Sequence, residues 1–259
     1  MASALELFDL HGKVAVVTGG GTGIGRQMAT ALAELGAQLV LCARKPERCE
    51  EAAAQLERTL GVRALGLRCD VTDPDEVAAM IERARSELGR VDVLVNNAGT
   101  TWGASPEDMP LEGWQKVVDV NLTGAFLCAQ AAGRAMIDQG EGGKIVNIAS
   151  VAGLHGAPPE VMNTVVYNAT KGGLIAFTRD LAWKWARHGI TVNAIAPGWF
   201  PSDMSRHVLD RQGGALLGSI PLGRYGGEDD LKGAVAYLAS AASAYVTGHV
   251  LVVDGGQSS

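Results

Sequence analysis

The chain has 259 residues, of which 47% are hydrophobic and 19% are charged, so it carries enough apolar material for a well-buried core and is far from a disordered composition. Its net charge is −6 and it has no long basic run, so neither nucleic acid nor an anionic membrane is expected as a partner. The first residues, MASALELFDL, lack the charged and apolar regions of a signal peptide, and no apolar stretch of about 18 residues follows. We therefore expect a soluble cytoplasmic protein.

Cysteine and histidine give no sign of a metal site. The cysteines show no CxxC spacing and the five histidines form no HExxH motif. We interpret the cysteines as small core residues in a reducing compartment, and we expect no structural metal; they are Cys42, Cys49, Cys69 and Cys128.

Short β-branched runs alternate with segments of helical length along the chain. The runs are apolar throughout, which is typical of strands covered by helices on both faces; they occupy residues 13–18, 37–42, 63–69, 91–96, 143–150, 190–196 and 249–254. Segments with helical period lie between them, among them 25–35, 74–88, 111–137 and 167–187. The alternation predicts an α/β fold, a doubly wound (Rossmann) parallel sheet of seven strands with right-handed crossovers, in a single domain over residues 1–259.

Two local features refine this prediction. Asp73 before Pro74, with Glu76 three residues after the cap, is a helix start signal. An irregular stretch from Trp199 to Gly227 breaks the alternation just before the last helix and strand, and we interpret it as a lid-like insertion. Ligands bind outside the carboxyl ends of the strands in such a sheet.

A glycine-rich stretch, TGGGTGIG at residues 18–25, directly follows the first strand. Glycine permits a tight turn and a close approach of the backbone, and the following helix N-terminus faces an anion. A merely flexible loop is the alternative, but the position favours a nucleotide-phosphate site that includes Gly19, Thr22, Gly23, Ile24 and Gly25. The Gly-Lys-Ser/Thr ending of an ATPase phosphate loop is absent, so ATP hydrolysis is not expected.

The second strand ends without the acidic residue that accepts a hydrogen bond from the ribose 2′-hydroxyl of NAD. Ala43 stands there, followed by Arg44 and Lys45, and a guanidinium suits a 2′-phosphate. A solvated charge at a helix start is the alternative. We predict that NADP(H) is preferred and NAD(H) is possible, with Asp70 holding the adenine ring and the sequence NNAG at residues 96–99 beside the cofactor.

Tyr167 and Lys171 are four residues apart in a segment of helical period, so they share one helix face. A cation beside a phenol favours the phenolate and is expected to lower the pKa of Tyr167. A phenol tuned in this way can exchange a proton near neutral pH.

Seven motifs, TGGGTGIG, NNAG, VNLTG, NIAS, YNATK, IAPG and VDGG, occur in the order and approximate spacing of the classical short-chain dehydrogenases/reductases, and the resemblance runs from Lys13 to Gly256. It implies that Tyr167 exchanges a proton with the substrate oxygen, Lys171 lowers its pKa and Ser150 is the second donor. Asn121 is implied in a water-linked proton relay through Lys171. The remaining cofactor contacts that the resemblance implies are Val71, Asn97, Ala98, Gly99, Pro197, Gly198, Ser202, Tyr167 and Lys171.

The chain departs from the family pattern at two places. The segment between Ser150 and Tyr167 is longer than usual and is stiffened by Pro158 and Pro159, which predicts an enlarged substrate loop at about 151–164. Ser202 stands where many members have threonine, and its hydroxyl is still expected to bind the nicotinamide carboxamide. The lid is expected at about 199–227.

The substrate is a small ketone or secondary alcohol whose identity the sequence leaves open. The expected pocket walls are Trp102, His155, Met162, Trp199, Phe200 and His207. The loop and lid look similar to those of gluconate 5-dehydrogenases and of bacterial 3-oxoacyl reductases, and we expect a gluconate 5-dehydrogenase-like enzyme or a carbonyl reductase. The alternative is a 3-oxoacyl-(acyl-carrier-protein) reductase, although the stretches at 134–144 and 181–189 are only weakly basic for docking an acidic carrier.

A second class of function and an assembly state also follow. A non-catalytic NADP(H)-binding regulator is the alternative of another class, but it would have no need for the four residues Asn121, Ser150, Tyr167 and Lys171 together. Family members are tetramers that pair the helices around 111–137 and 167–187 across one axis and the last helix and strand across another. The apolar terminal run at 249–254 needs cover, so we expect a homotetramer.

Overall fold

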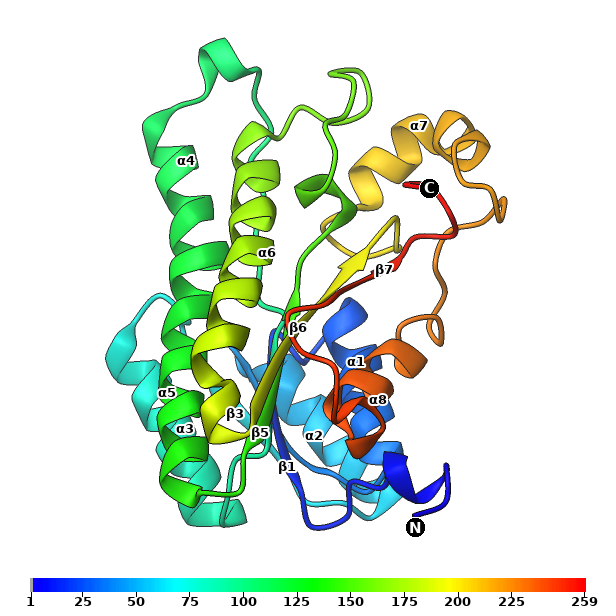
Figure 1. Ribbon diagram of the computed structural model, residues 1–259. Helices are drawn as coiled ribbons and strands as arrows, with labels where there is room; N and C mark the ends of the chain where they lie inside the picture. Colours follow the sequence, from blue (N-terminus) through cyan, green and yellow to red (C-terminus); the bar gives the residue numbers. More distant parts are fainter. Residues whose placement is uncertain (1) are drawn as a thin grey trace.

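Seven parallel strands form one sheet in the order β3–β2–β1–β4–β5–β6–β7 (Figure 1). The computed structural model describes residues 2–259, apart from the side chains of His207, Gln212 and Ala215. The strands are β1 (Val14–Thr18), β2 (Gln38–Ala43), β3 (Ala64–Arg68), β4 (Val93–Asn96), β5 (Gly143–Ile148), β6 (Ile190–Pro197) and β7 (Val250–Val253). Each overlaps one of the predicted runs, so the predicted fold class is confirmed.

Helices cover both faces of the sheet. One layer holds α1 (Gly23–Glu34), α2 (Glu47–Leu60) and α8 (Lys232–Ala239). The other holds α3 (Pro74–Leu88), α4 (Leu111–Val118), α5 (Gly124–Gln139) and α6 (Val165–Trp185). A further helix, α7 (Arg206–Gly218), lies beyond the carboxyl ends of the strands, near the C-terminal end of the chain in Figure 1. Since β1 lies between β2 and β4, successive crossovers leave it in opposite directions.

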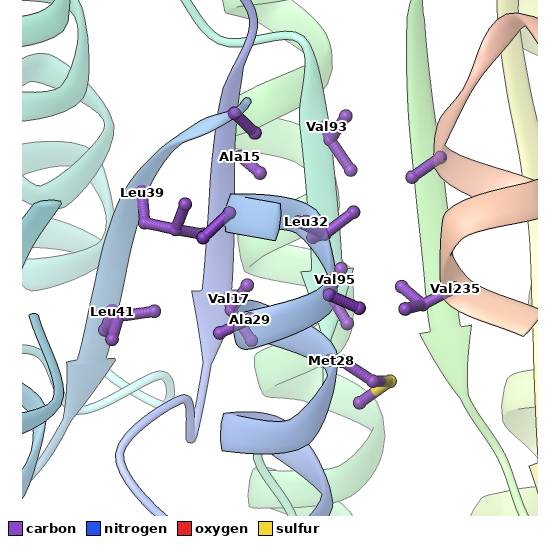
Figure 2. Packing of buried hydrophobic residues seen from close by; sticks show 14 of the residues in the cluster. Ala15, Val17, Met28, Ala29, Leu32, Leu39, Leu41, Val93, Val95 and Val235 are labelled. Atoms are coloured by element: carbon purple, nitrogen blue, oxygen red, sulfur yellow. The ribbon is translucent and has the colours of Figure 1, made fainter. Parts of the chain in front are cut away.

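The apolar runs are explained by the two cores. Ala15 and Val17 of β1 pack into one core with Met28 and Leu32 of α1, whereas Val16 packs into the core on the other face. Figure 2 shows α1 lying across β1, β2 and β4, with Val235 of α8 beside it. A strand buried on both faces cannot alternate apolar with polar residues, which is why these runs are continuously apolar.

The start signal of α3 works as predicted. Asp73 is the N-cap, and its side chain accepts hydrogen bonds from the backbone N–H groups of Asp75 (2.9 Å) and Glu76 (3.2 Å). The helix begins at Pro74, where a missing N–H leaves no intrahelical partner unsatisfied. The Glu76 carboxylate accepts instead from the backbone N–H of Asp70 at 2.8 Å, which ties the helix start to the end of β3.

Two segments differ from the sequence-based expectation. The predicted helix at 111–137 is interrupted by a π-helical turn, Asp119–Thr123, between α4 and α5. The stretch 199–227, expected to be irregular, contains the thirteen-residue helix α7. Gly213 and Gly214 in the middle of α7 weaken its helical signal, because glycine is a poor helix former.

Residues 2–259 contain neither a membrane-spanning helix nor a metal-binding cluster. No helix among them is long and apolar enough to cross a bilayer. No group of three or more histidine, cysteine, aspartate or glutamate side chains in the described chain could hold a metal ion.

Candidate active site

A cavity of about 1220 Å³ opens at the carboxyl ends of the central strands. The loops after β1, β4, β5 and β6 line it, together with α6, the segment 199–227 and the residues after β7. Most of the predicted site residues meet here: Gly19, Thr22, Gly23, Ile24, Gly25, Asn97, Ala98, Gly99, Ser150, Tyr167, Lys171, Pro197, Gly198 and Ser202. Asn121, Arg44, Asp70 and Val71 do not line it.

The glycine loop is held by the loop that follows β4. The Asn97 side-chain amide donates to the carbonyl oxygens of Thr18 (2.9 Å) and Gly19 (3.1 Å). The Thr18 hydroxyl in turn accepts from the backbone N–H groups of Asn97 and Ala98, both at 3.0 Å. Gly19 has φ +64°, and a Cβ on Gly25 would overlap the Gly19 carbonyl, so glycine is needed at both positions. The two loops form one rigid cradle.

Tyr167 and Lys171 lie one turn apart on α6, as predicted. The Lys171 Nζ is 5.6 Å from the centroid of the Tyr167 ring. It donates a 2.6 Å hydrogen bond to the Ile148 carbonyl oxygen at the end of β5, and the lysine is only 4% exposed. The ammonium is therefore fixed between the helix and the sheet, facing the cavity.

The direction of the Tyr167 pKa corrects the sequence-based expectation. We expected Lys171 to lower it, but burial raises the pKa of Tyr167 above its ordinary value, and hydrogen bonding to Ser150 opposes this only in part. Burial also lowers the pKa of Lys171 to about 8. Desolvation disfavours the charged form of each group, so the phenol stays protonated at neutral pH.

Ser150 follows β5 and caps a short 3-10 turn, Val151–Gly153. Its Oγ accepts from the Ala152 backbone N–H at 3.1 Å, which fixes the side-chain rotamer. Ser150 and Tyr167 both line the cavity, and Ser150 is close enough to lower the pKa of the Tyr167 phenol, so the two hydroxyls share one corner of the cavity. Two hydroxyls so placed can bind one substrate oxygen.

Asn121 sits in the π-helical turn and is 1% exposed. Its Oδ1 accepts from the Thr100 backbone N–H (2.8 Å), and its Nδ2 donates to the Thr100 carbonyl (3.0 Å) and the Thr170 hydroxyl (3.1 Å). A Cβ built on Gly99 would stand 3.4 Å from the Asn121 Oδ1 and 3.8 Å from the Lys171 Nζ. Asn121 thus lies behind the cavity wall, on the far side of Gly99 from the open space.

Comparisons with known proteins identify the family. A family model described as enoyl-(acyl carrier protein) reductase matches residues 19–258. The chain is 40% identical over 256 residues to 2-dehydro-3-deoxy-D-gluconate 5-dehydrogenase of Escherichia coli K12, covering 97% of this chain and 98% of that protein. It is also 40% identical over 248 residues to the 3-oxoacyl-[acyl-carrier-protein] reductase of the same organism, covering 96% and 98%. The chain belongs to the short-chain dehydrogenase/reductase family.

A solved structure of this family superimposes closely. It is a gluconate 5-dehydrogenase from Burkholderia cenocepacia J2315 in complex with NADP and tartrate, 39% identical, with a TM-score of 0.92 and 98% coverage of both chains. The present short-chain dehydrogenase/reductase is accordingly an NAD(P)(H)-dependent oxidoreductase that interconverts a ketone and a secondary alcohol by hydride transfer.

The two residues predicted to hold the adenosine end of the cofactor lie in a separate hollow. Arg44 and Asp70 line a second, smaller cavity together with residues of α4, among them Glu112 and Lys116. The Asp70 carboxylate accepts from the Thr72 backbone N–H (3.0 Å) and hydroxyl (2.8 Å). These hydrogen bonds lower its pKa despite burial, and Arg44 lowers it further, so the carboxylate is charged at neutral pH.

Val71 plays a packing role in the structure. It is 7% exposed, and its side chain closes on Gly124, where a Cβ would come within 2.7 Å of a Val71 methyl group. A glycine at position 124 therefore lets α5 pack close to the loop after β3.

The loop after Ser150 and the first part of the segment 199–227, which were predicted to surround the substrate, line one side of the cavity. His155, Met162, Trp199 and Phe200 line it as predicted. Trp102 does not: its ring packs on Gly113 of α4, and the Lys116 ammonium stands 5.6 Å from it. The prediction for Trp102 is wrong because the helix takes up its indole; Thr101 lines the cavity instead. The side chain of His207 lies outside the described residues.

Several cavity residues escaped sequence reasoning. They come from the N-terminal turn of α2, from α7 and the stretch just before it, and from the end of the chain: Arg48, Met204, Arg206, Val208, Leu209, Gln257, Ser258 and Ser259. The residues after β7 could have been found, because the carboxyl end of every parallel strand meets the same edge of the sheet. No local pattern marks Arg48 or the residues of α7.

Proposed function

We propose that this protein is an NADP(H)-preferring ketone reductase and alcohol dehydrogenase whose catalytic residues are Tyr167, Ser150, Lys171 and Asn121. One observation carries the proposal: the two hydroxyls and the buried ammonium share a single cavity with the glycine loop. A proton donor, a second hydrogen-bond donor and a phosphate cradle are the parts that hydride transfer to a carbonyl needs. The relative crystallised with NADP supports the cofactor.

The cavity fits a dinucleotide. Gly19, Gly23 and Gly25 line the cavity without any side chain, and the N-terminus of α1 at Thr22 faces it. Asp70 and Arg44 would hold the adenosine end, and Pro197, Gly198 and Ser202 the nicotinamide end. When bound, the nicotinamide supplies or accepts the hydride. Every proton movement is left to the residues of the chain.

In the direction of ketone reduction, the Tyr167 hydroxyl donates its proton to the substrate oxygen as negative charge develops there. The phenol is protonated at neutral pH, so it can act as the acid. The Ser150 hydroxyl donates a second hydrogen bond to the same oxygen, and the Lys171 ammonium stabilises the transient phenolate electrostatically. Asn121 contacts the Thr100 backbone and the Thr170 hydroxyl, so it positions the wall behind Gly99. In keeping with the family resemblance, it also helps to return a proton to Lys171.

Replacement of the phenol tests this assignment. Tyr167→Phe should lower the rate of NADPH-dependent ketone reduction by about 10²–10⁴-fold, since proton-transfer groups contribute on that order. Binding of NADPH, followed by fluorescence titration, should stay near wild type. A variant with near-normal kcat would remove Tyr167 from the mechanism, and a wild type that binds NADPH but turns over no ketone would favour a non-catalytic regulator.

For the cofactor, Ala43 supplies no carboxylate that would repel a 2′-phosphate, and Arg44 follows it. A charge-assisted contact of this kind contributes about 1.5–3 kcal/mol, or roughly ten- to a hundredfold in affinity. The double change Ala43→Asp with Arg44→Ala should shift the preference in kcat/KM toward NAD(H). A wild type that already favours NAD(H) would show Arg44 to be a solvated surface charge.

For the substrate, we propose a small ketone of the kind handled by gluconate 5-dehydrogenases or carbonyl reductases. The polar side chains of Thr101, His155 and Ser258 in the cavity support a substrate with hydroxyl groups. The second candidate is an acyl substrate, which the apolar side chains of Val161 and Leu209 favour. Both candidates have relatives at 40% identity.

A panel of ketones with NADPH, followed by absorbance, separates these substrates. It should hold 5-ketogluconate, an apolar aryl ketone and an acetoacetyl thioester. Preference for the keto acid supports the first candidate substrate, and preference for the thioester supports the second.

We further propose one domain over residues 1–259, with a substrate loop at 151–164 and a lid at 199–227, and a cytoplasmic location.

A further inference from the structure

An ion pair joins helix α2 to the segment 199–227 across the glycine loop. The Arg48 guanidinium donates to the Asp203 carboxylate at 3.1 Å. Both ends of this bridge rest on the loop beneath it: a Cβ on Gly21 would stand 2.9 Å from the backbone of Arg48, and one on Gly23 would stand 3.7 Å from Ser202. The pair therefore spans the part of the cavity where the phosphates of a dinucleotide have to lie.

Arg48 can easily exchange Asp203 for another anionic partner. The Arg48 and Asp203 side chains are 66% and 70% exposed, and an exposed pair of this kind contributes little to stability. Asp203 is also shared, because Arg206 approaches it at 3.7 Å. A 2′-phosphate, or the two phosphates of a pyrophosphate together, carries more charge than one carboxylate. Either group accepts both arms of a guanidinium, so it can take the place of Asp203 on Arg48.

Few other cations are available at this position. Among the described lysine and arginine side chains, those that line the cavity are Arg48, Lys171 and Arg206. Lys171 is committed to the Ile148 carbonyl deep in the site. Arg44 lies in the second cavity with Asp70, and Thr22 in the glycine loop is neutral. Arg48 is thus the guanidinium anchored directly on the glycine loop.

We propose that Arg48 is a phosphate-binding residue for the dinucleotide and that Asp203 occupies it in the absence of the phosphate. Cofactor binding would then exchange one partner of Arg48 for another and release Asp203, with the segment that carries it, from α2. The proposal rests on the proposed use of NADP(H), and it concerns either the 2′-phosphate or the pyrophosphate, which share the same chemistry.

Binding measurements on Arg48 variants test it. The dissociation constants of NADPH and NADH are measured by fluorescence titration for wild type, Arg48→Ala and Arg48→Lys. The control is Arg58→Ala, an exposed arginine at the other end of α2. We expect Arg48→Ala to weaken NADPH binding about ten- to a hundredfold, Arg48→Lys to weaken it less, and Arg58→Ala to leave it unchanged.

The two cofactors separate the two phosphates. A loss confined to NADPH assigns Arg48 to the 2′-phosphate, and an equal loss for both assigns it to the pyrophosphate. Unchanged affinity for both overturns the proposal. A wild type that binds neither cofactor would refute the proposed function instead.

The exchange itself is tested at Asp203. Removal of the competing carboxylate in Asp203→Asn should tighten NADPH binding several-fold, and this gain should disappear in the Arg48→Ala background. An unchanged or weaker affinity in Asp203→Asn would mean that the carboxylate holds Arg48 in place rather than competing for it, which overturns the exchange. Far-UV circular dichroism confirms that each variant is folded.

Discussion

Lys171 illustrates how a functional residue works against the stability of the fold. It is 4% exposed, no carboxylate pairs with it, and burial lowers its pKa to about 8. The folded chain therefore binds fewer protons than the unfolded chain between about pH 8 and the model-compound pKa of 10.5. The cost of burying the ammonium is fully present below pH 8 and is relieved as the pH rises to 10.5.

We predict that Lys171→Met abolishes turnover but stabilises the fold at pH 7. The burial cost corresponds to about 3 kcal/mol, and losing the hydrogen bond to the Ile148 carbonyl takes back about 1 kcal/mol. The free energy of unfolding from urea titration should rise by about 1–3 kcal/mol at pH 7, and the gain should shrink between pH 8 and 10.5. Lys184→Met, an exposed lysine of the same helix, should show neither effect. A less stable Lys171→Met at pH 7 would contradict the argument.

At the scale of elements, helix α7 beside the cavity is weakened by its own sequence. Helix α7 carries Gly213 and Gly214 at its centre, and each glycine costs about 0.5–1 kcal/mol relative to alanine in a helix interior. A Cβ on Gly213 would stand 3.4 Å from the Tyr225 hydroxyl, whereas a Cβ on Gly214 would meet nothing within 4 Å. The base of the segment is firmer, since the Gly226 backbone N–H donates to the Trp199 carbonyl at 2.9 Å. Helix α7 can therefore unwind locally at its centre while the base of the segment stays closed.

Gly214→Ala should stabilise α7 without touching its neighbours. We expect amide hydrogen exchange in residues 206–218, measured by mass spectrometry, to slow about two- to fivefold, which corresponds to about 0.5–1 kcal/mol. Gly233→Ala in α8, another exposed glycine whose Cβ would meet nothing within 4 Å, is the control and should leave that exchange unchanged. Identical exchange in Gly214→Ala and wild type would show that the glycine does not limit the helix.

At the scale of the whole molecule, apolar side chains remain exposed on α4–α6 and at the β7 edge. Phe126 is 43% exposed and packs edge-on against Phe177, with ring centroids 6.3 Å apart. Val252 of β7 is 38% exposed, and β7 forms one edge of the sheet. Surfaces of this kind commonly mark protein–protein contacts, so the homotetramer remains our prediction.

Light scattering tests this assembly. Wild type should have the mass of a tetramer at micromolar concentration, and Phe126→Glu should reduce it, because a buried unpaired charge disfavours the interface. Leu60→Glu on α2 is the control, since Leu60 is 39% exposed, nearly as much as Phe126, and lies on the other face of the sheet. A monomeric wild type, or the same mass in all three proteins, would reject this interface.

The sequence by itself determined the strands of the sheet, most of the helices and the glycine loop, because these depend on local patterns. A strand covered on both faces has to be apolar throughout, and the start of α3 is specified by Asp73 and Pro74 at adjacent positions. The pairing of Tyr167 with Lys171 follows from helix geometry alone.

The tertiary structure decided which side chains share the cavity and how they titrate. The π-helical turn carries Asn121 behind Gly99, α4 takes up the Trp102 indole, and Arg48 reaches Asp203 across a sequence separation of 155 residues. The Tyr167 pKa is raised, although the sequence suggested that it would be lowered, because the effect of burial outweighs that of the neighbouring Ser150. Contacts between distant segments and desolvation are properties of the packed chain, and no local pattern encodes them.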